Sequence, residues 1–184
     1  MHRIFSKSPY WFLVGALLGG AANVAAQTPD TLSGEVKFTY RTIKNNLIKL
    51  AEKMPAEDYT FRPTPEVETF GRRVAHIADA NMNVCAGLNG ERKSLGAASK
   101  TSKADLVAAL KESFAYCDGV VDSLTDATAK EMVSSRLGGP FPPEPTRSRL
   151  GTLTNLVRHS NEIYGYMAVY LRLKGIVPPT SAPE

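Results

Sequence analysis

Histidine is the scarcest residue type here that could carry metal or acid–base chemistry. The sequence contains three histidines, His2, His76 and His159. His2 lies in an N-terminal segment that we expect to be removed, so His76 and His159 are the whole supply. Neutral imidazole is a common ligand of divalent metals and also exchanges protons near neutral pH. Two nitrogens alone hold such an ion poorly, because a catalytic zinc site usually takes three protein ligands and a water molecule.

Both histidines also have a simpler interpretation, as half-buried side chains hydrogen-bonded to their neighbours. His159 comes about one helical turn after Leu156 and one before Ile163, which turns it toward the interior. His76 lies beside an apolar stripe rather than at its centre. From the residues alone, a metal site and a hydrogen-bonded pair are both open.

Other kinds of active site find little support. No serine stands in a Gly-x-Ser-x-Gly context, no cysteine is visibly paired with a histidine, and no glycine-rich phosphate loop follows a strand. Arg62 and Arg172 could bind an anionic substrate, or they could tie their own segments to the fold. No Lys/Arg stripe with interleaved aromatic residues is present, so nucleic-acid binding has no electrostatic support.

The two cysteines, Cys85 and Cys117, fall on apolar faces of two expected helices. In an oxidising compartment an even pair of cysteines is a candidate disulfide. Two buried thiols fit the pattern equally well, because the distance between the side chains cannot be read from sequence.

Four long segments with helical periodicity must position these side chains. Each carries an apolar stripe at three- and four-residue spacing, and together they cover about residues 31–54, 69–88, 102–124 and 148–174. Their ends carry recognisable signals, which are Pro55 after the first helix, Thr69 and Ser102 as N-caps of the second and third, and Gly175 after the last.

The connecting segments are short or rich in proline. Residues 56–65 contain two prolines that exclude a regular helix, residues 90–101 are a loop, and a short helix is expected within 126–134, before a proline-rich loop at 138–145. No segment alternates with period two, so a sheet is not expected. The sequence therefore predicts an all-α protein, an antiparallel four-helix bundle, as a single domain over residues 27–184.

The first 26 residues are typical of a signal peptide. Basic residues at Arg3 and Lys7 precede an apolar stretch at 10–18, and Val24-Ala25-Ala26 fits a signal-peptidase site with cleavage after Ala26. A retained anchor is the alternative, but the stretch is about half the ~20 residues of a transmembrane helix. We therefore expect an exported protein, periplasmic or secreted, which is not an integral membrane protein after cleavage. Removal of the segment leaves 20 basic against 18 acidic residues, so the apparent basicity nearly disappears.

Two blocks of the sequence resemble the DinB-like family of helical bundles. The first block is Tyr59-x-Phe61-Arg62-Pro63-Thr64-Pro65, Phe70-Gly71 and Val74-Ala75-His76-Ile77-Ala78-Asp79-Ala80, and the second is His159-x-Asn161-Glu162-x-Tyr164-Gly165 with Tyr170-Leu171-Arg172-Leu173-Lys174-Gly175-Ile176-Val177-Pro178-Pro179-Thr180-Ser181. The resemblance spans essentially the whole mature chain. It is strongest to the exported branch of the family, in which a signal peptide and this Pro-Pro-Thr/Ser ending are common.

The resemblance implies a divalent-metal site, with zinc, nickel or iron, made by three histidines. One lies on the second helix, and two on the last helix are spaced His-x-x-x-His. His76 matches the first ligand and His159 the second, whereas Ile163 occupies the third position. Isoleucine cannot coordinate a metal, and its apolar side chain would desolvate the place where an ion should sit.

Several residues could compensate for Ile163. Glu162 is adjacent but points about 100° away around the helix. Asp79, one turn after His76, is a second oxygen donor, and Tyr164 is a poorer one. A homodimer that shares a metal is a further route. The expectation is one divalent ion or none.

Two functions of different classes follow. Relatives in the family are metal-dependent hydrolases and thiol S-transferases, so the first is a metal-dependent enzyme acting on a small molecule. Export argues against the thiol reactions, because low-molecular-weight thiols are cytoplasmic, and favours hydrolysis of an extracytoplasmic compound. The second is a non-catalytic binding or accessory bundle whose metal site has degenerated, and Ile163 is its main support.

Overall fold

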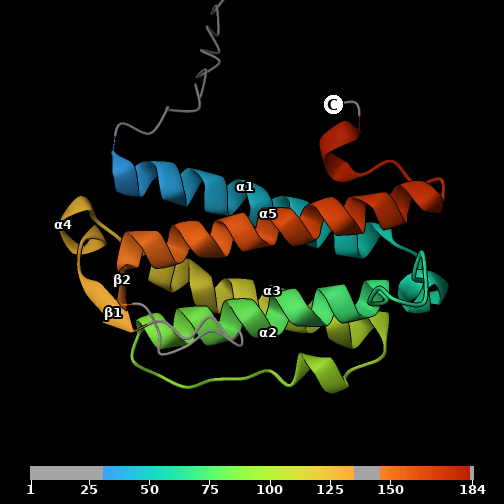
Figure 1. Cartoon of the computed structure of the whole chain (residues 1–184), viewed down its shortest axis with the longest axis horizontal. Coiled ribbons are helices and arrows are strands. Elements are labelled where there is room, and N and C mark those ends of the chain that lie inside the picture. Colours follow the sequence, from blue (N-terminus) through green and yellow to red (C-terminus); the bar gives the residue numbers. More distant parts are fainter. Residues whose placement is uncertain (1–30, 135–145, 183–184) are drawn as a thin grey trace, which may run out of the picture.

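The computed structural model describes residues 31–134 and 146–182, most of them in four long helices (Figure 1). These are α1 (Leu32–Lys53), α2 (Phe70–Leu88), α3 (Lys103–Asp122) and α5 (Arg149–Leu173). The shorter elements are α4 (Asp126–Ala129) and the 3-10 turns η1 (Ala56–Thr60), η2 (Ala97–Ser99) and η3 (Pro179–Ser181). The predicted helical-bundle fold is confirmed. The expected signal peptide, residues 1–26, and the proline-rich loop at 138–145 lie outside the described residues.

The long helices form two parallel pairs. Helices α1 and α5 run in one direction, and α2 and α3 run in the opposite direction. Lys174 at the end of α5 pairs with Asp58, just beyond the end of α1, so these two helices run the same way. Cys85 and Cys117 join the second halves of α2 and α3. The segment between Leu88 and Lys103 runs back along the bundle, which lets α3 start at the same end as α2 (Figure 1). The contacts between α1 and α3 and between α2 and α5 are antiparallel.

The helix ends follow the local signals in the sequence. The Thr69 side chain accepts a hydrogen bond from the Arg72 N–H, and the Ser102 side chain accepts one from the Asp105 N–H. Gly175 has a positive φ of 72°, the left-handed conformation that glycine adopts without a steric cost. Caps of this kind satisfy backbone N–H groups that a helix start leaves without partners.

The short helix expected within 126–134 is present, but the prediction that the chain would form no sheet is wrong in one place. The helix α4 ends at Ala129, and strand β1 (Met132–Ser134) pairs antiparallel with β2 (Thr146–Ser148). Each strand has only three residues, so neither is long enough to show the alternation by which a strand is detected. The pair leads directly into α5, whose N-cap is Ser148.

The core lies between the four long helices and is almost entirely apolar. Its largest fully buried members are Leu47, Leu50, Met54, Phe70, Ile77, Leu106, Leu110, Phe114, Leu153, Leu156, Met167 and Leu171. Gly71 marks a close approach, because a Cβ atom there would lie 3.1 Å from the Tyr59 carbonyl oxygen and 3.2 Å from Leu106. No helix in the described part of the chain is long and apolar enough to cross a membrane.

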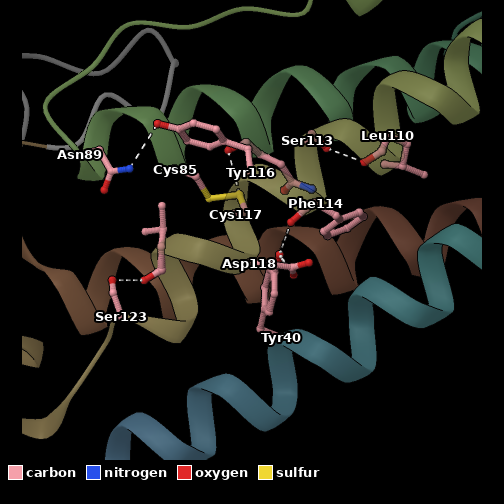
Figure 2. Close-up of a disulfide and its surroundings, with 12 residues drawn as sticks. Tyr40, Cys85, Asn89, Leu110, Ser113, Phe114, Tyr116, Cys117, Asp118 and Ser123 are labelled. Carbon is pink, nitrogen blue, oxygen red and sulfur yellow. Dashed lines mark hydrogen bonds between the residues drawn. A yellow bond between two sulfur atoms is a disulfide. The ribbon is translucent and has the colours of Figure 1, made fainter.

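A disulfide joins α2 to α3 inside this core (Figure 2). The Cα atoms of Cys85 and Cys117 are 5.3 Å apart, within the usual range for a disulfide, and both residues are fully buried. The structure thus has the first of the two arrangements that the sequence left open. Nearby, the Tyr40 hydroxyl lies 3.1 Å from an Asp118 carboxylate oxygen, which links α1 to α3 on the other side of the bond (Figure 2).

Candidate functional site

The two histidines meet between α2 and α5. The Nε2 atom of His76 lies 2.9 Å from the Nε2 atom of His159, although 83 positions separate them in the sequence. The rings are nearly perpendicular, with an interplanar angle of 74° and centroids 5.0 Å apart. The antiparallel packing of α2 against α5 therefore brings together the two residues that the sequence singled out.

The contact requires at least one neutral imidazole, because one nitrogen must donate a hydrogen and the other must accept it. Desolvation, assisted by the Arg73 guanidinium, lowers the pKa of His76. Desolvation, assisted by the charge of His76, lowers the pKa of His159. Both shifts favour the neutral form near pH 7, which is also the form that binds metals.

The histidine pair borders a cavity of about 620 Å³, a size typical of small-molecule sites. Helices α2 and α5 and the connector before α2 form its walls. Apolar surface comes from Pro63, Val67, Ile163, Val169 and Tyr170, and polar groups come from Thr64, Arg73, His76, His159, Glu162 and Tyr166. A few polar groups on a largely apolar lining are what a small-molecule site needs for affinity and orientation.

The connector is held in place as a wall by Tyr170 of α5. The Tyr170 hydroxyl donates a 2.6 Å hydrogen bond to the Glu68 carbonyl oxygen. The Tyr170 ring also packs edge-on against Phe61, at 6.0 Å between centroids. The connector that carries the Phe61-Arg62-Pro63 motif is thereby attached to the helix that carries His159.

Ile163 occupies the third position of the expected ligand set, and its apolar side chain fills the place of a metal ligand. Its side chain lines the cavity yet is only 3 % exposed, packed into the core. Glu162 reaches the opposite side of His159, where its carboxylate lies 4.0 Å from Nδ1 rather than from Nε2. Tyr166 donates a 3.0 Å hydrogen bond to that carboxylate, and Arg158 lies 3.5 Å from it. Glu162 therefore lies beside Nδ1 of His159, beyond hydrogen-bond distance, and is not grouped with the two Nε2 atoms.

The other two oxygen donors considered from the sequence are committed elsewhere. The Asp79 carboxylate accepts 3.0 Å hydrogen bonds from the N–H groups of Ala97 and Ala98, so it anchors the η2 turn. The Tyr164 hydroxyl lies 2.9 Å from the hydroxyl of Thr180 and ties down the C-terminal turn. Within residues 31–134 and 146–182, no three His, Cys, Asp or Glu side chains are grouped to hold a metal ion.

The donor set fits an open metal site and does not fit a closed one. With metal–nitrogen bonds of about 2.0–2.1 Å, two nitrogens 2.9 Å apart can bind one ion side by side. The remaining positions would have to be filled by solvent or by a molecule in the cavity. Within the described residues no third His, Cys, Asp or Glu joins the pair, so the residues present there do not make a structural site with four protein ligands.

Two cavity residues, Arg73 and Tyr166, were not identified from the sequence. The Arg73 guanidinium lies over the Tyr166 ring, 5.4 Å from its centroid. The helical repeat contained the signal, because Arg73 precedes His76 by three positions and Tyr166 follows His159 by seven, so each shares a helix face with a histidine. By contrast, Arg62 donates to the Pro65 carbonyl and Arg172 to the Ser181 hydroxyl, which confirms their role in tying local segments together.

The family of this chain follows from its similarity to known proteins. The model of the DinB superfamily matches residues 39–167, a span that includes both histidines. The chain belongs to the DinB superfamily. No curated protein matches the chain.

Solved structures show the same fold at low sequence identity. A DinB-like protein from Bacillus cereus ATCC 10987 is 17 % identical, with a TM-score of 0.65 over 78 % of this chain and 93 % of that one. A DinB-like protein from Bacillus subtilis is 16 % identical, with a TM-score of 0.58 over 77 % and 92 %. A conserved protein from Enterococcus faecalis is 13 % identical, with a TM-score of 0.59 over 79 % and 98 %.

Proposed function

We propose that this chain is an exported DinB-superfamily protein that binds a small molecule in the cavity, where His76 and His159 together hold one divalent cation. The reaction class that this arrangement supports is metal-dependent hydrolysis, with group transfer as the related alternative. The observation that carries the proposal is the 2.9 Å approach of the two Nε2 atoms at the edge of a 620 Å³ cavity. Members of the superfamily often bind metal, which adds support.

The chain's own residues have distinct parts in this site. The two imidazoles are the metal ligands, and their lowered pKa values keep them neutral and ready to bind near pH 7. Glu162, held by Tyr166, lies 4.0 Å from Nδ1 of His159, where its negative charge favours a hydrogen on Nδ1 and leaves Nε2 free to bind the metal. Ile163 excludes water from the third ligand position, so the open positions face the cavity. The chemistry that a divalent cation supplies when bound is Lewis acidity, which activates water or a thiol.

A second function, a non-catalytic binding bundle, is favoured by Ile163. This side chain is buried in the core, and the two histidines satisfy one another by a direct hydrogen bond. A protein of this kind would use the cavity for binding alone. The two functions differ in metal affinity, since the first requires one bound divalent cation and the second requires none.

The first experiment is a metal titration of chain purified without a histidine tag and stripped of metal. Calorimetry with zinc, nickel, manganese and iron(II) should show one ion bound per chain by the wild type. His76→Ala and His159→Ala should each abolish that binding, because a single imidazole remains. Asp79→Asn is the matched control, since Asp79 holds the η2 turn; its metal affinity should equal that of the wild type.

Ile163→His tests the geometry of the third position. It should tighten metal binding at least about tenfold, because losing even an outer-shell partner of a ligand costs about that much. A wild type that binds none of the four metals, beside an Ile163→His variant that does, would establish the degenerate site and exclude the metal-dependent function. No binding by either protein would show that the site does not hold a metal at all.

A further inference from the structure

Arg73 is a positively charged residue of the cavity lining. It lies on α2, one turn before His76, and lines the same cavity. Its Nε atom is buried and has no hydrogen-bond partner within residues 31–134 and 146–182, and its guanidinium packs against the ring of Tyr166. No carboxylate in the described part of the chain forms an ion pair with it. A guanidinium held partly inside the fold without an acceptor is costly, so an anion in the cavity that Arg73 lines would offset its charge.

The nearest carboxylates are already committed. Glu162 is engaged by Tyr166 and Arg158, both on its own helix. Glu68 pairs with Arg72, 3.5 Å away, rather than with Arg73. The unmatched positive charge of Arg73 therefore faces the cavity, next to two histidines that are mostly neutral near pH 7.

The rest of the lining defines the remainder of the ligand. Val67, Val169 and Tyr170 present apolar surface, and the Tyr166 ring forms a flat face under the guanidinium. An Arg fork pairs well with carboxylate or phosphate oxygens through two parallel N–H groups. An apolar body with one oxyanion group complements both features.

We propose that the cavity binds a small organic anion, with its carboxylate or phosphate group on Arg73 and its apolar body along Val67, Val169 and Tyr170. This inference rests on the proposed function, in which the cavity is the ligand site. It adds the chemical class of the ligand. The anion-binding end lies at Arg73, one helical turn from the histidines, so the opposite charges of an anion and a cation can both be accommodated.

The test is calorimetric binding to metal-free protein, desalted after chelation because common chelators are themselves polycarboxylates. The probes are hexanoate, pentyl phosphate and the neutral analogue hexanamide, which share a pentyl chain. At least one anion should bind about tenfold or more tightly than hexanamide, the size expected for a charge-assisted hydrogen bond. The stronger of the two anions identifies the group that Arg73 accepts.

Variants at two neighbouring arginines locate the effect. Arg73→Gln should reduce anion binding to the level of hexanamide, and Arg73→Lys should keep part of the preference. Arg72→Gln removes the same charge one position away, on a side chain that contacts Ala98 and Glu68 instead, and should keep the full preference. Thermal melts confirm that each variant is folded.

Equal binding of all three probes to the wild type would overturn the inference, as would an anion preference that survives in Arg73→Gln. If Arg73→Gln does not fold, Arg73→Lys is the deciding variant. An anion preference over hexanamide as large in Arg73→Lys as in the wild type would contradict a contact made by two parallel guanidinium N–H groups. The proposed function fails separately. If the protein prefers anions but binds no metal, this inference holds and the proposed metal site is wrong. If it binds metal but does not prefer anions, the metal site holds and this inference is wrong.

Discussion

At the scale of single residues, the contact between His76 and His159 makes the native state sensitive to acid. Each imidazole has a lowered pKa in the fold, because it is partly desolvated and close to another ring or to Arg73. The other charged groups near the pair are Arg72, Arg158, Glu68, Asp79 and Glu162. Protonating both rings would also break their hydrogen bond, since neither could accept.

We therefore predict that metal-free protein loses stability as the pH falls. The unfolded chain has histidines with pKa values of about 6.5, and the folded chain has lower ones. Between these values the unfolded state binds more protons, so the stabilisation is present above about pH 6.5 and is lost as the pH falls through the folded pKa values. Denaturant unfolding between about pH 8 and about pH 5 should show a steeper loss in the wild type than in a His76→Gln/His159→Gln variant. The prediction would be wrong if the free energy of unfolding changed with pH equally in the two proteins.

The residue scale also shows what sequence reasoning could reach. His76 and His159 were identified by their type and by family resemblance, and Ile163 by its spacing from His159. Their contact at 2.9 Å depends on which helices pack together, which no local pattern states. Arg73 was missed because an arginine on a helix usually faces solvent, and only the packing of Tyr166 against it shows otherwise.

At the scale of elements, local signals were the easiest to read. The caps at Thr69 and Ser102 depend on neighbours within three residues, so the sequence contains the whole cause. The strands β1 and β2 form only because they pair with each other, and each is too short to show an alternating pattern in the sequence. The parallel course of α2 and α3 depends in turn on the long return loop between them.

The disulfide fixes this parallel pair of helices. It closes a loop across a sequence separation of 32. In the chain-entropy description a cross-link of this span stabilises the folded state by about 3–4 kcal/mol, because it restricts the unfolded chain.

We predict that reduction lowers the free energy of unfolding by about 3 kcal/mol. Denaturant unfolding of the oxidised protein, with and without a thiol reductant, measures the difference. The Cys85→Ala/Cys117→Ala variant should unfold at lower denaturant and be insensitive to reductant, which makes it the internal control. Intact mass should show the oxidised wild type lighter by two hydrogens. Identical unfolding curves with and without reductant would mean that the bond does not stabilise the chain in solution.

At the scale of the whole molecule, the disulfide is consistent with the expected export of the chain. A disulfide persists in an oxidising compartment and is rare in the cytosol. Residues 1–26 have the pattern of a cleaved signal segment, so we propose that the chain acquires its Cys85–Cys117 bond after leaving the cytosol.

We predict that the mature protein starts at Gln27. Expression of the full chain in a bacterial host, followed by fractionation and intact-mass analysis, should place the processed form outside the cytoplasm. Ala26→Phe puts a large residue where the peptidase requires a small one and should leave the precursor uncut. Thr28→Ser, just beyond the site, should be processed normally. A full-length protein in the cytoplasmic fraction would refute export.

The long-range character of the cavity has a consequence for how the protein folds. His76 and His159 are 83 positions apart, and Tyr170 reaches Glu68 across 102. Contacts that close large loops are slow to form, since the entropy of closure must be overcome before they contribute. The cavity is therefore complete only once α5 has docked on α2, and a ligand that fits it would bind only molecules in which these two helices have come together.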